Sequence, residues 1–361
     1  MTLTYLDLTD AQRAGLDALP FDGNHLVSGP PGSGKSLLAA QRAVMLALTG
    51  TPVTLLTRSN LLRHSLAAMV HALGPRDRSV RVATGHAWLA DWYGDKAPRS
   101  PDGWYDWHAL FERAADTGPL PGLTLVVDEG QDLPPEFYLL CRLLGARTTV
   151  YADECQRLTD TNSTLAEIAR NLGRCSRQEL DGNHRNTEQI ASFAAHFHTG
   201  TGTPALPEGQ GPLPRLHRFH ERGAADLLAL LAERHPRKSI GVIVGSKHTQ
   251  FSLLGSLSRR APRLKPQLYT SEAKGGQYRN LDLGRPGIVI VHRASAKGLS
   301  FDTVVVPDTH TDAAADPSAA AVRMTYYVLA TRARHELHLG YEGESEPPMT
   351  AQVDRNTLIR G

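Results

Sequence analysis

The stretch Gly29-Pro30-Pro31-Gly32-Ser33-Gly34-Lys35-Ser36 lies between a short apolar run, His25 to Ser28, and an amphipathic segment, Lys35 to Leu48. It matches the pattern G-x4-G-K-[ST] in full, and a strand before it and a helix after it are the context that this phosphate-binding loop requires. Glycines let backbone N–H groups converge on phosphate oxygens, and the helix points its positive end at the same anion. The stretch therefore predicts a P-loop in an α/β domain.

The residues of this loop predict a site for ATP and Mg²⁺. We expect the backbone at Gly29, Gly32 and Gly34 to cradle the phosphates. Lys35 would supply positive charge to the β- and γ-phosphates, and the Ser36 hydroxyl would ligate Mg²⁺. The alternative is a glycine-rich turn that binds nothing, and the matching flanks on both sides argue against it.

A second motif, Leu125-Val126-Val127-Asp128-Glu129-Gly130-Gln131-Asp132, ends an apolar run in two adjacent carboxylates about 90 residues after the P-loop. Asp128 is expected to hold Mg²⁺, and Glu129 to orient or deprotonate the water that attacks the γ-phosphate. An acidic strand end can also be a solvated turn. The P-loop upstream favours the catalytic interpretation.

Apolar runs and amphipathic segments alternate along the chain, which indicates parallel α/β sheets. Strands are expected at 25–28, 53–57, 124–127, 148–151, 239–244, 287–291, 304–306 and 336–339, and helices at 35–48 and 61–73. The Gly- and Pro-rich segment 199–214 resembles a linker. The glycine-containing segment 272–279 is expected to be a solvated hairpin or a basic loop.

Composition excludes several classes of protein. The 361 residues are enough for two domains, and no stretch is apolar over the roughly 18 residues that a membrane span needs. The amino terminus lacks the pattern of a signal peptide. Cys141, Cys155 and Cys175 are an odd number without CxxC spacing, which favours the reducing cytoplasm over a disulfide framework. A net charge of +2 does not exclude nucleic acid, because binding depends on where the charge lies.

Asp-Glu-x-Gln-Asp at 128–132 resembles the Walker B motif of superfamily 1 helicases of the UvrD/Rep type. Further segments resemble other motifs of that family in the same order: 8–12 the Q motif, 56–58 motif Ia, 84–88 the following DNA-contact motif, 152–156 motif III, 180–187 motif IV, 296–302 motif V and 327–334 motif VI. The resemblance extends from about residue 8 to residue 340.

The resemblance implies two RecA-like P-loop domains with parallel sheets and the nucleotide in the cleft between them. The expected parts are 1–185 as the first motor domain, with a residual insertion at about 88–120, then 186–345 as the second domain and 346–361 as a C-terminal tail. The implied nucleotide contacts are Gln12 with adenine, Gly298 in motif V, Gln156 as the γ-phosphate sensor, and Arg185 and Arg332 on the γ-phosphate. The implied nucleic-acid contacts are Thr57, Arg58, His86 and His292.

Several positions depart from the family pattern. The spacing between motifs leaves no room for the two large inserted subdomains. Ser300 stands where motif V carries a Glu that contacts ribose, and His292 and Ala294 stand where Thr and His face DNA. Motif III continues as Arg157-Leu158-Thr159-Asp160 in place of base-stacking aromatics. The chain is thus expected to be a reduced form, with the ATP half nearly intact and the DNA half altered.

All four tryptophans lie within a short stretch of the chain, at positions 88, 92, 104 and 107. Three interpretations are open: the core of a residual insertion, a platform on which bases stack, or an anchor for a partner protein.

Two functions follow from these patterns. The first is ATP hydrolysis coupled to movement on single-stranded DNA, 3′-to-5′ by resemblance. The second is an ATP-gated module that closes on ATP and signals to a protein partner such as a nuclease, without processive unwinding. A small-molecule P-loop kinase is a third class, but the Q motif at Gln12 and the arginines of a second α/β unit argue against it.

Overall fold

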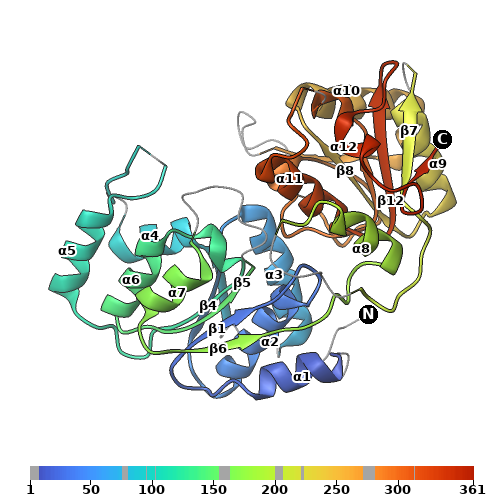
Figure 1. The fold of residues 1–361 in the computed structure, drawn as a ribbon. Helices are drawn as coiled ribbons and strands as arrows, with labels where there is room; N and C mark the ends of the chain where they lie inside the picture. The colour runs from blue at the N-terminus through green and yellow to red at the C-terminus, as the bar shows by residue number, and fades with distance from the viewer. Residues whose placement is uncertain are drawn as a thin grey trace. The chain divides into compact units, whose positions relative to one another are not determined.

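The computed structural model describes residues 8–74, 80–94, 96–101, 103–153, 163–199, 206–220, 223–270, 281–312 and 314–361. The chain forms two compact units, Met1–Gly182 and Asn183–Gly361. The boundary between them falls inside the 180–187 segment that resembles motif IV. Each unit contains one sheet and its own helices, and Figure 1 shows the two units with their elements labelled.

The sheet of the first unit contains six described strands, and all of them are parallel. The strands are β1 (Asn24–Ser28), β2 (Val53–Thr57), β3 (Val80–Thr84), β4 (Thr124–Val127), β5 (Arg147–Ala152) and β6 (Cys175–Glu179). Their order is β3-β2-β4-β5-β1-β6. The helices are α1 (Asp10–Asp17), α2 (Lys35–Leu48), α3 (Asn60–Leu73), α4 (Gly85–Tyr93), α5 (Trp107–Thr117), α6 (Pro135–Leu143) and α7 (Leu165–Leu172). Because all strands point the same way, their carboxyl ends meet at one edge of the sheet.

Helices cover both faces of this sheet, as in doubly wound folds. Apolar residues of α1, α2 and α3 pack on one face, around Leu38, Leu55 and Val126. Residues of α4 to α7 pack on the other, around Phe137 and Ile168. The central strands are buried on both faces, which explains why β2 and β4 are continuous apolar runs in the sequence.

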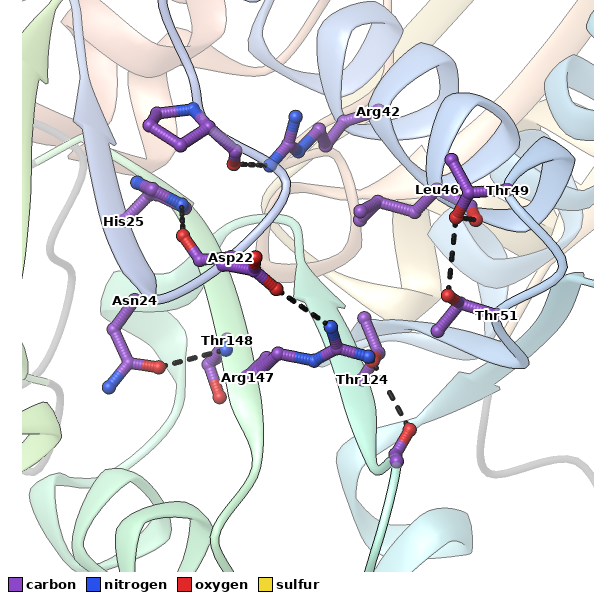
Figure 2. Close-up of polar contacts among 12 residues, drawn as sticks. Asp22, Asn24, His25, Arg42, Leu46, Thr49, Thr51, Thr124, Arg147 and Thr148 are labelled. Atoms are coloured by element: carbon purple, nitrogen blue, oxygen red, sulfur yellow. Dashed lines mark hydrogen bonds and ion pairs between the residues drawn. The ribbon is translucent and has the colours of Figure 1, made fainter.

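Polar contacts tie the amino ends of the strands together on the opposite edge (Figure 2). Arg147 donates to the Asp22 carboxylate at 3.1 Å and to the Thr124 hydroxyl at 3.1 Å, which links β5 to β4 and to the turn before β1. The Asn24 side chain accepts from the Thr148 backbone N–H at 3.0 Å. Arg42, fully buried, donates to the carbonyls of residues 19 and 20. These groups join side chains and backbone atoms at the amino edge, away from the carboxyl edge.

The second unit contains a sheet of seven described strands, again all parallel, in the order β13-β7-β12-β11-β8-β10-β9. The strands are β7 (Arg215–Phe219), β8 (Ser239–Val244), β9 (Gln267–Tyr269), β10 (Gly287–His292), β11 (Phe301–Val306), β12 (Ala333–Glu342) and β13 (Ile359–Arg360). The helices are α8 (Glu188–Ala195), α9 (Gly223–Arg234), α10 (Lys247–Arg260), α11 (Ala320–Ala330) and α12 (Pro348–Ala351). Short 3₁₀ turns lie between these elements: Pro262–Leu264 follows α10, and Arg293–Ser295 follows β10.

Residues 346–361, set apart above as a tail, form α12 and the edge strand β13, which pairs with β7. One face of the sheet packs on α9 and α10 around Leu228, Leu257 and Ile290. The helices α8 and α11 contact each other and β12. No helix in the described parts of the chain is long and apolar enough to cross a membrane.

Every strand expected from apolar runs is present. Besides the two-residue β13, four described strands were not anticipated: β3, β6, β7 and β9. The polar sequence CSRQE of β6 shows why, since this edge strand is largely half-buried or exposed and needs no apolar run. The segment 206–214 contains no helix or strand, in keeping with a linker, whereas 200–205 and the expected loop at 272–279 lie outside the described residues.

Candidate functional site

The P-loop connects β1 to α2 at the carboxyl edge of the first sheet. Gly32 and Gly34 have φ values of 88° and 93°, in the left-handed region that residues with a Cβ rarely adopt. A Cβ on Gly34 would lie 2.3 Å from Gln12 Nε2. The loop therefore needs glycine at Gly34 for two reasons, backbone conformation and close approach of the Gln12 side chain.

Lys35 is buried, and its ammonium group is held inside the loop. Nζ donates to the carbonyl oxygens of Gly29 at 2.6 Å and Pro30 at 2.8 Å, and lies 3.3 Å from Asp153 Oδ2. Asp153 follows β5, the neighbour of β1 in the sheet. The lysine is thus positioned at the loop by three oxygen partners, in the place where the P-loop motif puts it beside phosphate.

Gln12 lies against the P-loop, where the sequence placed the Q motif. Its side-chain amide donates to the Ser33 carbonyl at 3.1 Å and accepts from the Thr9 N–H at 3.1 Å. Thr9 and Gln12 form a capping box at the start of α1. One amide hydrogen and one lone pair are used in these two bonds, so the amide keeps one further donor and one further acceptor site for a base.

Asp128 follows β4 and forms a hydrogen bond with Ser36, the two residues expected to hold Mg²⁺. The pKa of Asp128 is raised to about 7, first by burial and then by the neighbouring Glu129 charge, while Ser36 and Lys35 oppose the shift. Asp128 Oδ2 is buried without a hydrogen-bond partner. An orphaned carboxylate oxygen beside a hydroxyl fits a Mg²⁺ ion, which takes one or two protein oxygens and completes its shell with water and phosphate. Mg²⁺ there would also favour the ionised carboxylate.

Glu129 has a φ of 53°, which is unusual for a residue other than glycine and costs free energy. Its carboxylate accepts from Gln131 Nε2 at 2.5 Å. Gln131 in turn accepts from the Asp153 backbone N–H at 2.9 Å, and all three residues are buried. A continuous set of contacts thus joins Glu129 to Gln131, Asp153 and Lys35.

Gln131 and Asp153 were not singled out from the sequence. Gln131 lies in the 128–132 motif and Asp153 in the 152–156 motif, so each motif pointed to the right segment. The contact between the two residues depends on the pairing of β4 with β5. The expected γ-phosphate sensor Gln156 lies outside the described residues.

The second unit brings the two expected arginine segments together. The Asn186 side chain, next to Arg185, donates to the carbonyls of Thr331, at 3.2 Å, and Ala333, the residues on either side of Arg332. The Arg332 guanidinium is buried and donates to the carbonyls of Val328 and Leu299 at 3.0 and 3.3 Å. Asn186 lies within the 180–187 segment, but its contact with both neighbours of Arg332 was not anticipated from the sequence.

Gly298, expected to contact nucleotide in motif V, has a left-handed φ of 76° just before β11. Ser300, which replaces the expected Glu, accepts a hydrogen bond from Arg334 at 3.0 Å. The hydroxyl therefore takes part in a contact within the second unit.

The expected nucleic-acid contacts of the first unit also lie at its carboxyl edge. Arg58 is exposed after β2, and His86 is the second residue of α4, after β3. Thr57 is fully buried, so its side chain does not face solvent, as contact with a nucleic-acid strand would require. Among these three positions, Arg58 and His86 are the ones that the fold presents near the surface.

Trp104 packs against both of these side chains. The His86 ring stacks on Trp104 with centroids 4.0 Å apart, and the Arg58 guanidinium lies 4.3 Å from the centre of the Trp104 ring. His86 Nε2 also lies 3.1 Å from the Gly103 carbonyl oxygen. Trp104 is only 4% exposed and belongs to the apolar core with Trp88, while Trp92 and Trp107 pack against that core. The tryptophans are thus core residues, but of the core that covers one face of the first sheet and not of a separate insertion. Trp104 also contacts two of the expected nucleic-acid residues.

His292 ends β10 and is engaged at both ring nitrogens. Nε2 lies 2.9 Å from the Gly245 carbonyl oxygen, and Nδ1 accepts from the Ala294 N–H at 3.2 Å. These bonds require the neutral ring with hydrogen on Nε2. Nη1 of the next residue, Arg293, donates to both carboxylate oxygens of Asp312, at 2.9 and 3.0 Å. The side chain of His292, an expected nucleic-acid contact, and that of its neighbour Arg293 therefore both make contacts within the second unit.

Comparison with known proteins identifies the fold. Neither the scan against protein-family models nor the search of curated proteins finds a match. Among solved structures, Saccharomyces cerevisiae Dbp5 bound to RNA and ADP BeF3 is similar over 98% of this chain and 89% of that chain, with 13% identity and a TM-score of 0.57. The C-terminal domain of a possible DNA helicase from Lactobacillus plantarum is 23% identical over 49% of this chain and 97% of that chain, with a TM-score of 0.37. The PRRSV helicase is 13% identical over 95% of this chain and 55% of its own, with a TM-score of 0.46.

The likeness to Dbp5 extends over both units. This chain has the fold of two RecA-like domains, each with a parallel sheet, as the sequence predicted.

Proposed function

We propose that this chain is a reduced superfamily 1 motor of the UvrD/Rep type, which hydrolyses ATP and moves on single-stranded DNA in the 3′-to-5′ direction. The observation that carries the ATPase part is the convergence of Lys35, Ser36, Asp128 and Glu129 at the carboxyl edge of one sheet. This edge is where parallel α/β sheets bind their ligands.

The residues of this edge divide the chemistry among themselves. Ser36 and Asp128 would hold Mg²⁺, which supplies positive charge to the phosphates when bound. Phosphate oxygens would replace the Gly29 and Pro30 carbonyls as partners of Lys35. Glu129 would accept the proton of the attacking water, and Gln131 holds the Glu129 carboxylate in place for that step.

Residues outside the P-loop edge would complete the reaction. Arg185 and Arg332 would stabilise the charge that spreads over the transferring phosphoryl oxygens, and Gln156 would sense the γ-phosphate. The hydrogen bonds from Asn186 to the carbonyls of Thr331 and Ala333 link the segments that carry Arg185 and Arg332. This link supports a role for both arginines at the same phosphate.

The experiment for this proposal is an ATPase measurement with and without single-stranded DNA, together with unwinding of a forked duplex. We expect hydrolysis to rise with single-stranded DNA, and binding to be weak, independent of sequence and sensitive to salt. Unwinding by the chain alone should be poor, since the spacing of motifs leaves little room for inserted subdomains. An ATPase that ignores every single strand at low salt would contradict the translocase.

A second function is favoured by the contacts of the expected DNA residues. Arg58 and His86 pack on Trp104, and both nitrogens of His292 are used inside its own unit. An ATP-gated module that signals to a protein partner such as a nuclease needs the ATP site but no strand contact at these positions. The two functions are separated by the same ATPase assay: the module hydrolyses ATP without DNA stimulation and is stimulated by its partner.

A further inference from the structure

A cavity of about 540 Å³ lies at the amino-terminal edge of the second sheet. Gly287 and Ile288, the first two residues of β10, line it, whereas His292 ends the same strand. A strand rises about 3.3 Å per residue, so the five steps from Gly287 to His292 separate the cavity from the carboxyl edge by roughly 17 Å. No residue assigned above to ATP or DNA lines this cavity.

Three cationic side chains surround the cavity. Arg263, Lys265 and Arg285 line it and are exposed, and no carboxylate is among the lining residues. Within the described parts of the chain, none of the three forms an ion pair. Their like charges are therefore not neutralised by the fold, which is the arrangement expected where an anion binds.

Hydrogen bonds connect the segments that carry Lys265 and Arg285. The side chain of Gln267 forms two hydrogen bonds with the Asp282 backbone, at 2.9 and 3.0 Å, which fixes the turn that carries Arg285. Arg285 donates to the Lys265 carbonyl. The two cations therefore lie on connected segments, and not on independent surface side chains.

The backbone at Lys265 is strained. Its φ is 44°, and among described residues other than glycine only Glu129 shares a positive φ. Such conformations cost free energy and cluster at ligand-binding and catalytic sites. Glu129 lies at the candidate catalytic edge, and Lys265 lines this cavity. The strained backbone at Lys265 therefore points to the cavity independently of its charge.

Apolar side chains form another part of the lining. Ala232 and Ile288 are buried, and Leu264 is half-buried between Arg263 and Lys265. A pocket of several hundred cubic ångströms with an apolar lining and a few polar groups suits an organic ligand. A ligand that matches both parts carries several negative charges and a less polar body.

We propose that this cavity binds the phosphate groups of a nucleotide, either free or within a nucleic acid strand, with Arg263, Lys265 and Arg285 on the phosphates. The sugar and base then lie against the apolar lining. Arginine and lysine are the side chains that bind phosphate best in proteins, and aliphatic contact is tolerant of base identity. This site is separate from the ATP site and does not depend on the proposed function.

The test compares a triple variant, Arg263→Gln, Lys265→Gln and Arg285→Gln, with a charge-matched control, Arg174→Gln, Arg215→Gln and Arg355→Gln. The control arginines are exposed and do not line the cavity. Each protein is kept at saturating Mg²⁺ and a non-hydrolysable ATP analogue, so that the P-loop is filled. A 20-nucleotide single strand is titrated by fluorescence anisotropy, and uridine 5′-diphosphate by calorimetry.

We expect the triple variant to lose at least tenfold in affinity for one of the two probes, and the control to stay within about twofold of wild type. For the strand, loss of three phosphate contacts should reduce the slope of log K against log salt by about 2, since each contact contributes roughly 0.7. The probe that responds identifies the source of the phosphate. Equal affinities of the triple and control variants for both probes, or no binding of either probe by the wild type, would overturn the site. ATPase turnover of the triple variant without DNA should match wild type, so a failure here is distinct from a failure of the ATP site.

Discussion

Lys35 and Asp153 form a buried ion pair at the carboxyl edge of the first sheet, with Nζ 3.3 Å from Oδ2. The two residues follow neighbouring strands, β1 and β5. A buried ammonium without partners would be costly, so Asp153 and the loop carbonyls stabilise Lys35 where a phosphate would otherwise do so. Through Gln131, Asp153 also connects this lysine to Glu129.

Replacing Lys35 with alanine is expected to abolish ATP hydrolysis. In the proposed site the ammonium stabilises phosphate charge, and loss of one such donor typically costs about 10²–10³-fold in turnover. Phosphate release measures the effect, and circular dichroism checks the fold. Lys96→Ala, an exposed lysine of the same unit, is the matched control. A folded Lys35→Ala protein with normal turnover would refute the P-loop assignment.

Glu129→Gln should separate nucleotide binding from hydrolysis. The amide keeps the size of the side chain and leaves Asp128 and Ser36 for Mg²⁺, but it removes the carboxylate that accepts the proton. Equilibrium binding of ATP should be nearly unchanged while single-turnover hydrolysis stalls. The exposed Glu112→Gln serves as control. Wild-type single-turnover rates in Glu129→Gln would show that another group handles the water.

Gln131→Met should slow hydrolysis by about 10–100-fold, because small displacements of a catalytic group are this costly. Gln131 is fully buried, and its amide fixes Glu129 on one side and the Asp153 backbone on the other. Methionine has similar volume and makes neither bond. The measurement is kcat against ATP affinity, with affinity expected to change less. An unchanged kcat would mean that Gln131 serves folding alone.

Arg185→Ala and Arg332→Lys should each lower turnover by about 10³-fold if both guanidinium groups act on the γ-phosphate as arginine fingers do. Lysine at 332 keeps the charge but loses the forked geometry that bonds Val328 and Leu299. ATP affinity should change much less than turnover. Arg334→Ala, an exposed arginine two residues further on, tests whether loss of charge alone explains the result. Turnover that falls equally in Arg334→Ala would argue against the finger role.

Acid should destabilise the chain partly through His217. Burial, followed by the charges of His338 and Arg215, lowers the pKa of His217 to about 4, so the folded state favours the neutral ring. The unfolded chain binds the proton near pH 6.5, and this stability is therefore present above that pH and lost as pH falls toward 4.

His217→Gln should consequently reduce the drop in Tm between pH 7 and pH 5 by a few degrees. His217 Nε2 lies 3.0 Å from His338 Nδ1, and His338 contacts Glu336 through its other ring nitrogen. The change in Tm therefore reports the titration of these three groups together. His108→Gln, at an exposed histidine, should leave the pH dependence as it is in wild type. Identical pH profiles for His217→Gln and wild type would contradict the linkage.

The P-loop and the acidic end of β4 could be predicted from the sequence because the parts of each are contiguous. A P-loop contains its glycines, lysine and hydroxyl in eight successive residues, and a strand that ends in Asp128 and Glu129 needs no distant partner to be recognised. The central strands were equally readable, since burial on both faces makes each a continuous apolar run.

Edge strands and contacts between strands were decided by the tertiary structure. The edge strand β6 is polar, so it shows no alternation of apolar and polar residues that would predict a strand. The strand β13 is only two residues long. Gln131 meets Asp153, Trp104 meets His86, and Asn186 meets both flanks of Arg332 only once the chain has folded. The members of these pairs are separated by 18 to about 145 residues in the sequence. Local periodicity fixes which face of an element is buried, but not which element lies beside it, and that order of strands is what brings the side chains together.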